Sequence, residues 1–151
     1  MNVEKKLAEL GLALPKRSSA GSYVGAVRAG DLVFVSGGGP LKADGSFITG
    51  KIGAELSIDE GKEAAKLCAL YCLASLQETI GELDKVKRIV KLLGFVNSGS
   101  GFAQQHVVMN GASDLLIELF GENGRHARSA VGMAELPMNI AVEVEMIVQV
   151  D

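Results

Sequence analysis

The sequence predicts an α+β fold, a two-layer sandwich with a mixed sheet on one side and two long helices on the other. Two observations predict it. Strand-like runs occur in pairs near both ends of the chain, and two long stretches with helical spacing of apolar residues lie between them. The 151 residues can bury one core, and no linker-like tract divides them, so we expect a single domain over residues 1–151.

The N-terminal part predicts a short helix and then a β-hairpin. Apolar residues at helical spacing predict a helix over Val3–Leu10 within an N-terminal extension of residues 1–20. Strands over 23–28 and 32–36, joined by a turn, predict the hairpin. Gly37-Gly38-Gly39 follows without the Gly-Lys-Ser/Thr ending of a P-loop. It is either a flexible strand end or a loop whose backbone approaches a ligand closely.

The remainder alternates helices and strands. Ser57 and Glu60 form a capping box that opens a helix to about Ile80. A strand from about Val86 to Phe95 and a helix within 102–120 come next, and residues 125–145 resemble two strands joined by a Leu-Pro turn in a closing hairpin. With both helices on one face, the apolar strands leave another face to cover, which favours a homo-oligomer.

Composition narrows the function classes. A net charge of −3 gives no general attraction to nucleic acid or to an anionic membrane, and we expect the basic segment 85–91 to be a solvated strand margin. Neither a membrane-spanning run nor a signal-peptide pattern is present, so cytoplasmic residence is expected. Cys68 and Cys72 are predicted to be buried thiols rather than metal ligands, because the two histidines lie far along the chain.

The chemistry-bearing residues are in the C-terminal run. Arg128 begins its first strand, and Glu143 and Glu145 share one face of its second strand. An arginine fork suits a carboxylate, and a glutamate opposite it can hold or activate a water, so the pair suggests a small organic acid as ligand. The alternatives are a structural ion pair for Arg128 and a solvated or interface role for the glutamates. His106 and His126 are candidates for acid–base work or solvated loop histidines.

From Tyr23 to Val148 the chain resembles the Rid family, the reactive-intermediate deaminases, also called YjgF-like proteins. The family signature is an Arg, a Val, a Leu-Pro and a Val-Glu-Val/Ile-Glu strand, and a strand that ends in Ser-Gly. The chain matches it with Arg128, Val131, Leu136-Pro137, residues 142–145 and residues 33–37.

The resemblance implies a chorismate-mutase-like fold and a homotrimer with a ligand cleft at each subunit interface. It also implies hydrolysis of 2-imino or enamine acids to 2-keto acids and ammonia, without a metal or a cofactor. Carried over, Arg128 holds the substrate carboxylate and Glu143 positions the attacking water. The remaining residues implied are Gly37 and Ala130 as backbone contacts, and Tyr23 and Ser36 as cleft-lining residues.

The chain departs from the family pattern at three places. Gly38-Gly39 stands where members usually carry Gln and an apolar residue, and Ala130 stands where Cys is frequent. His106 aligns with a frequent Asn, and Asn110 lies one turn later. A non-enzymatic trimer that binds a small carboxylate and regulates another process is therefore kept as the alternative function, with a ribonuclease third. The sequence does not specify the substrate.

Overall fold

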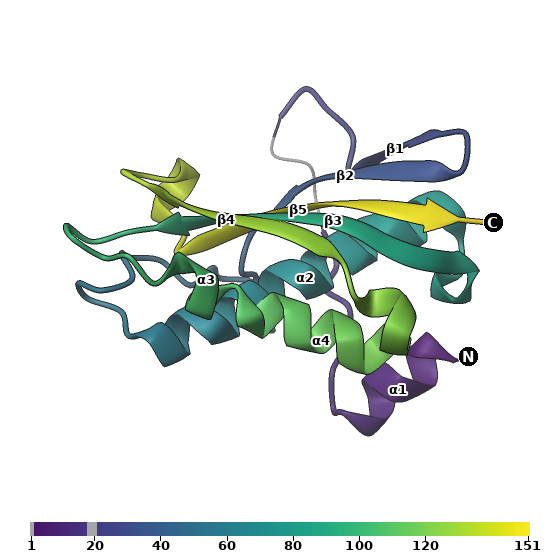
Figure 1. Cartoon of the computed structure of the whole chain (residues 1–151), viewed down its shortest axis with the longest axis horizontal. Helices are drawn as coiled ribbons and strands as arrows, with labels where there is room; N and C mark the ends of the chain where they lie inside the picture. The colour runs from purple at the N-terminus through teal and green to yellow at the C-terminus, as the bar shows by residue number, and fades with distance from the viewer. Residues whose placement is uncertain (1, 18–20) are drawn as a thin grey trace.

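The computed structural model describes residues 2–17 and 21–151. It consists of one sheet with α2 and α4 packed against one of its faces (Figure 1). The predicted two-layer α+β architecture is therefore confirmed. The strands are β1 (Ala26–Ala29), β2 (Leu32–Gly38), β3 (Val86–Asn97), β4 (Ala127–Met133) and β5 (Val142–Val150). The helices are α1 (Val3–Glu9), α2 (Ile58–Ile80), α3 (Gln105–Val108) and α4 (Asn110–Phe120), with 3₁₀ turns at Leu83–Lys85, Gly121–Gly124 and Pro137–Asn139.

The predicted C-terminal hairpin is wrong. The strand order is β1-β2-β5-β3-β4, so β3 lies between β4 and β5. The segment that contains α3 and α4 returns the chain to the end of the sheet where β3 began, and β4 must then run parallel to β3. Residues 134–141 cross the end of β3, and β5 pairs antiparallel with both β3 and β2. A Leu-Pro turn signal is local and does not show which strand lies beyond the turn.

Buried polar groups hold this crossing in place. Asn97 is fully buried, and its Nδ2 donates to Asn139 Oδ1 at 3.0 Å and to the Ile140 carbonyl at 3.1 Å. Lys51 Nζ donates to Asn97 Oδ1 at 2.8 Å and also to the Ala134 carbonyl. The connection is thus tied at both of its ends, which fixes where β5 begins.

The other predicted elements are present with shifted ends. Ser57 and Glu60 form the expected capping box of α2. The predicted first strand starts at Ala26 rather than Tyr23. Just before it, Ser36 holds the incoming chain by donating its backbone N–H to the Gly25 carbonyl at 2.9 Å and its hydroxyl to the Val24 carbonyl at 2.7 Å. The helix predicted within 102–120 is divided at Met109 into α3 and α4.

The core lies between the sheet and the helices. Helix α1 buries Val3 and Leu7, so the N-terminal extension contributes to the core. Cys68 and Cys72 are fully buried, as predicted, and their thiols donate to the Val142 and Val144 carbonyls. Burial raises the pKa of the Cys72 thiol to about 12, so it stays protonated at neutral pH.

The sheet face away from the helices is partly apolar. Val142 and Val144 are buried under the helices, so the alternation along β5 places Glu143 and Glu145 on this other face. Three apolar side chains on this face remain open to solvent in the single chain: Val27 (55% exposed), Phe34 (45%) and Val131 (38%).

Candidate functional site

Arg128 lies on the helix side of edge strand β4, and three oxygen atoms hold its guanidinium. Nη1 donates to Asn110 Oδ1 at 2.9 Å and to Ser113 Oγ at 3.1 Å. Nη2 donates to the His106 carbonyl at 3.0 Å. These contacts use three of the five N–H donors of a guanidinium. Nε and one N–H of Nη2 donate to no group among the described residues, and two neighbouring guanidinium donors can bind a carboxylate through parallel hydrogen bonds.

Ser113 is itself oriented by His126. The Gly124 carbonyl can only accept, so the 2.7 Å contact places a proton on His126 Nδ1. In the neutral ring Nε2 then accepts from the Ser113 hydroxyl at 2.8 Å, and Ser113 Oγ accepts from Arg128. Burial lowers the pKa of His126, and the charge of Arg128 lowers it further, which favours this neutral form. We call Arg128, Asn110, Ser113 and His126 the arginine cluster.

Glu143 lies on the opposite face of the sheet, beside the irregular end of β2. A methyl group at Gly37 would lie 2.5 Å from Glu143 Oε2, so only glycine allows this approach. The register between β2 and β5 shifts between Val35 and Gly38, and this bulge presents Ser36 and Gly37 at the strand end. Of the two interpretations of the glycine run, close backbone approach applies at Gly37, although the neighbouring group is a side chain of the protein itself.

Glu143 carries an uncompensated charge. Burial raises the pKa of its carboxyl, and the neighbouring Glu145 raises it further. Its carboxylate makes neither a hydrogen bond nor an ion pair with any residue of 2–17 or 21–151. A half-buried carboxylate with a raised pKa and a free lone pair is suited to take and return a proton.

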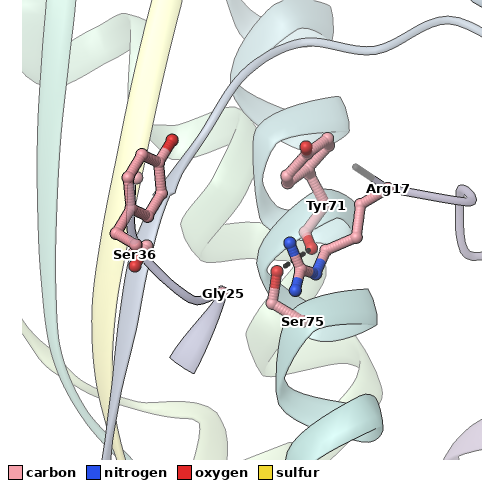
Figure 2. A pocket seen from close by; sticks show the side chains of 7 residues that line it. Arg17, Gly25, Ser36, Tyr71 and Ser75 are labelled. Carbon is pink, nitrogen blue, oxygen red and sulfur yellow. Dashed lines mark hydrogen bonds between the residues drawn. The ribbon is translucent and has the colours of Figure 1, made fainter. Parts of the chain in front are cut away.

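Three more of the predicted site residues line one pocket next to Glu143. Tyr23, Ser36 and Gly37 share it with Gly25, Arg17 and two residues of α2, Tyr71 and Ser75. Figure 2 shows Arg17 reaching from the N-terminal segment to the surface of α2, across from Ser36. We call Tyr23, Ser36, Gly37 and Glu143 the glutamate cluster.

The structure does not bring Glu143 to Arg128 within one chain. In the sheet register Arg128 is level with Leu92 and Met146, whereas Glu143 is level with Phe95 and Val131. Arg128 contacts the helix layer, and Glu143 is on the face away from it. Ala130, also on β4, packs partly against the core on the side of Arg128. Each cluster thus presents part of a site, and one chain does not bring the two parts together.

Sequence reasoning left three residues without a role. Asn110 and Ser113 are the side chains that hold Arg128, and their spacing of three on a helix is the signal that pairs them. His106, aligned with the family Asn, contributes only its carbonyl to Arg128. Arg17 lies in the N-terminal extension, and nothing in the sequence around it distinguishes it from a solvated arginine.

The described part of the chain offers neither a metal-binding cluster nor a membrane span. Residues 2–17 and 21–151 bring together no group of three His, Cys, Asp or Glu side chains that could hold a metal ion. None of the helices among these residues combines the length and the apolar character needed to cross a bilayer.

The architecture matches a known family over nearly the whole chain. The model of the family described as "YjgF/chorismate_mutase-like, putative endoribonuclease" matches residues 4–150. The chain belongs to the YjgF family. This membership also accounts for the Arg, Leu-Pro and Val-Glu-Val-Glu signature of its C-terminal run.

Relatives of this YjgF-family chain are found in distant organisms. Protein TCP17 of Trypanosoma cruzi is 46% identical over 151 residues, which cover 99% of this chain and 94% of the relative. The crystal structure of Atu1372, of unknown function, from Agrobacterium tumefaciens has a TM-score of 0.91 at 43% identity and covers 99% of this chain and 94% of that one. A "putative endoribonuclease" from Shewanella oneidensis has a TM-score of 0.95 at 32% identity and covers 99% and 100%.

Proposed function

We propose that this YjgF-family protein hydrolyses reactive 2-imino and enamine acids to 2-keto acids and ammonia, in clefts shared between copies of the chain in a homotrimer. One observation carries the proposal. Within residues 2–17 and 21–151, Arg128 is held by three acceptors and keeps two N–H donors for a carboxylate, whereas Glu143, on the other face of the sheet, is a charged group without a partner. A second copy that brings its glutamate cluster to this arginine cluster completes a site for an acid and a water.

The reaction follows from these two groups. The substrate carboxylate binds the Nε and Nη2 edge of Arg128, which orients the imine carbon. Glu143 removes a proton from water as the water oxygen bonds to that carbon, and it passes this proton to the imine nitrogen to give a carbinolamine. The carboxylate then takes the hydroxyl proton of the carbinolamine and delivers it to the amine nitrogen as the C–N bond breaks, and a 2-keto acid and ammonia leave. An enamine first takes a proton on carbon to become the imine.

The outer sheet face supports the trimer. Val27, Phe34 and Val131 place exposed apolar side chains on β1, β2 and β4, across the width of the sheet. Contact with other copies of the chain would remove this surface from water. Light scattering at micromolar concentration should give the mass of three chains, and a monomer mass would contradict the shared cleft.

The alternative is a trimer that binds a small carboxylate without chemistry, for which the arginine cluster alone would suffice. The word endoribonuclease in the family description raises a third function. It is less favoured, because both ring nitrogens of His126 are occupied by Ser113 and Gly124 and are not free for acid–base work on RNA.

The test uses an imino acid generated freshly by an amino acid oxidase, with release of ammonia and keto acid measured in the presence and absence of the protein. We expect the parent and Glu145→Gln to accelerate release. We expect Glu143→Gln to bind the keto acid product and yet lose the acceleration. Equal rates with and without the parent protein would favour the binding trimer.

A further inference from the structure

Arg17 is a largely buried cation in the pocket of the glutamate cluster. Its side chain is 13% exposed. The other residues that line the pocket are uncharged: Tyr23, Gly25, Ser36, Gly37, Tyr71 and Ser75. Burial of a charge among neutral groups is costly unless an opposite charge and hydrogen bonds compensate it.

The compensation within the chain is incomplete. Arg17 Nη2 forms an ion pair with Glu78 Oε2 at 3.0 Å, but Glu78 is 57% exposed, and water screens such a pair. Arg17 Nε is buried and has no hydrogen-bond partner among the residues that the structure describes. Arg17 does not compensate the charge of Glu143 either. Burial and the neighbouring Glu145 shift the pKa of Glu143, and both raise it.

The pocket is shaped around the guanidinium. A methyl group at Gly25 would collide with the Arg17 guanidinium, so only glycine permits the contact shown in Figure 2. The remaining space is about 10 Å³, close to what one water molecule or one carboxylate oxygen needs. The space left in the pocket lined by Arg17 is therefore about the size of a single anionic oxygen.

We propose that Arg17 binds a second carboxylate of the substrate, so that this protein acts on dicarboxylic 2-imino acids. The inference rests on the proposed function, in which Arg128 of an adjoining copy holds the first carboxylate. Arg17 is then a specificity-determining residue, and the Ser36–Gly37 strand end lies between the reacting group and the distal acid. The N-terminal extension supplies this residue, which gives the extension a role in substrate selection.

The experiment compares keto acids that differ by one carboxylate. Binding of 2-oxobutanoate, oxaloacetate and 2-oxoglutarate is measured by calorimetry on the full-length oligomer. We expect the parent to bind at least one of the two diacids about 10-fold more tightly than 2-oxobutanoate, because a charge-assisted contact is added. Arg17→Gln should abolish this preference and leave the affinity for 2-oxobutanoate unchanged.

Two further variants separate the ligand role from a structural one. Glu78→Gln breaks the same ion pair but keeps the cation, so it should retain the preference for the diacid. Gly25→Ala keeps the cation but displaces it, so it should reduce the preference as Arg17→Gln does. Equal loss of thermal stability in Arg17→Gln and Glu78→Gln, with no change in the preference, would show that Arg17 only ties the N-terminal segment to α2.

The failures are distinguishable. If the parent binds 2-oxobutanoate but neither diacid more tightly, or if Arg17→Gln keeps the preference, the inference is overturned and the proposed function stands. If the parent binds none of the three acids, the proposed function fails, and the inference fails with it.

Discussion

The arginine cluster and the glutamate cluster differ in how far the chain itself satisfies them. In the arginine cluster, hydrogen bonds run from Arg128 through Ser113 and His126 to the Gly124 carbonyl. In the glutamate cluster, the charge of Glu143 has no partner in the part of the chain that the structure describes, and burial and Glu145 both disfavour it. The first cluster is organised before any ligand arrives, and the second holds an unfavourable charge.

This difference indicates a division of work. A rigid fork with a free edge suits binding, because little side-chain entropy remains to be lost when the carboxylate arrives. A carboxylate with a raised pKa suits proton transfer, because its pKa is closer to neutral pH than the pKa of a solvated glutamate. In the proposed function, the cluster that transfers protons lowers the stability of the fold, and the cluster that binds the carboxylate does not.

The largest expected effect concerns whether the clusters come from different copies. Arg128→Ala and Glu143→Gln should each lower the deamination rate by at least about 100-fold. Trimers that contain both variants should regain about a third of the parent rate, because each of them has one cleft in three with an intact arginine and an intact glutamate. Co-expression with two affinity tags and an ammonia assay measure this. If the mixed oligomers are as inactive as the single variants, the two residues do not form a site shared between copies of the chain.

The next effect concerns the arginine cluster alone. Arg128→Ala should weaken binding of a 2-keto acid by about 30-fold or more, since losing one partner of a dehydrated charge pair costs roughly 2–5 kcal/mol. Arg128→Lys should restore only part of the affinity, because lysine lacks the fork. Calorimetry gives both values. Arg125→Ala is the matched control, since it removes the same charge from an exposed neighbour. If Arg128→Ala dissociates the oligomer instead, the residue is structural.

A smaller effect concerns Asn110, which orients Arg128 without carrying a charge. Asn110→Ala removes one of three acceptors of Arg128 and should weaken binding by about 5-fold, the value of a single hydrogen bond of about 1 kcal/mol. Asn110→Asp should weaken binding further, because the new carboxylate competes with the ligand for Arg128. Tighter binding in Asn110→Asp would show that the ligand does not approach the free edge of Arg128.

The smallest effect concerns the cost in stability of the ionised Glu143 carboxylate. Because the folded-state pKa of Glu143 is raised, its ionisation destabilises the folded state at high pH, and this effect is absent below the ordinary value of 4.5. Glu143→Gln should therefore raise the melting temperature by roughly 1–3 °C at pH 7, a modest gain because water screens the half-exposed carboxylate. The gain should vanish near about pH 4. Scanning calorimetry measures it, and a gain that grows in acid would contradict the assignment.

The sequence determined the elements and their faces. The capping box of Ser57 and Glu60, the helical stripes and the alternation along β5 are local patterns, and local patterns follow from backbone geometry alone. They placed Cys68 and Cys72 in the core, and Glu143 and Glu145 together on one face. They also made Arg128 and Glu143 the candidate site residues of the C-terminal run.

Only the tertiary structure decided which of these residues meet. The insertion of β3 between β4 and β5 separates Arg128 from Glu143, although a turn signal between their strands suggests a hairpin. The packing of α4 against the edge strand brings Asn110 and Ser113 to Arg128, and the path of the N-terminal segment brings Arg17 to Ser36 and Gly37. Strand order and helix packing depend on contacts between residues far apart in the chain, and the order of residues along a single sequence does not encode them locally.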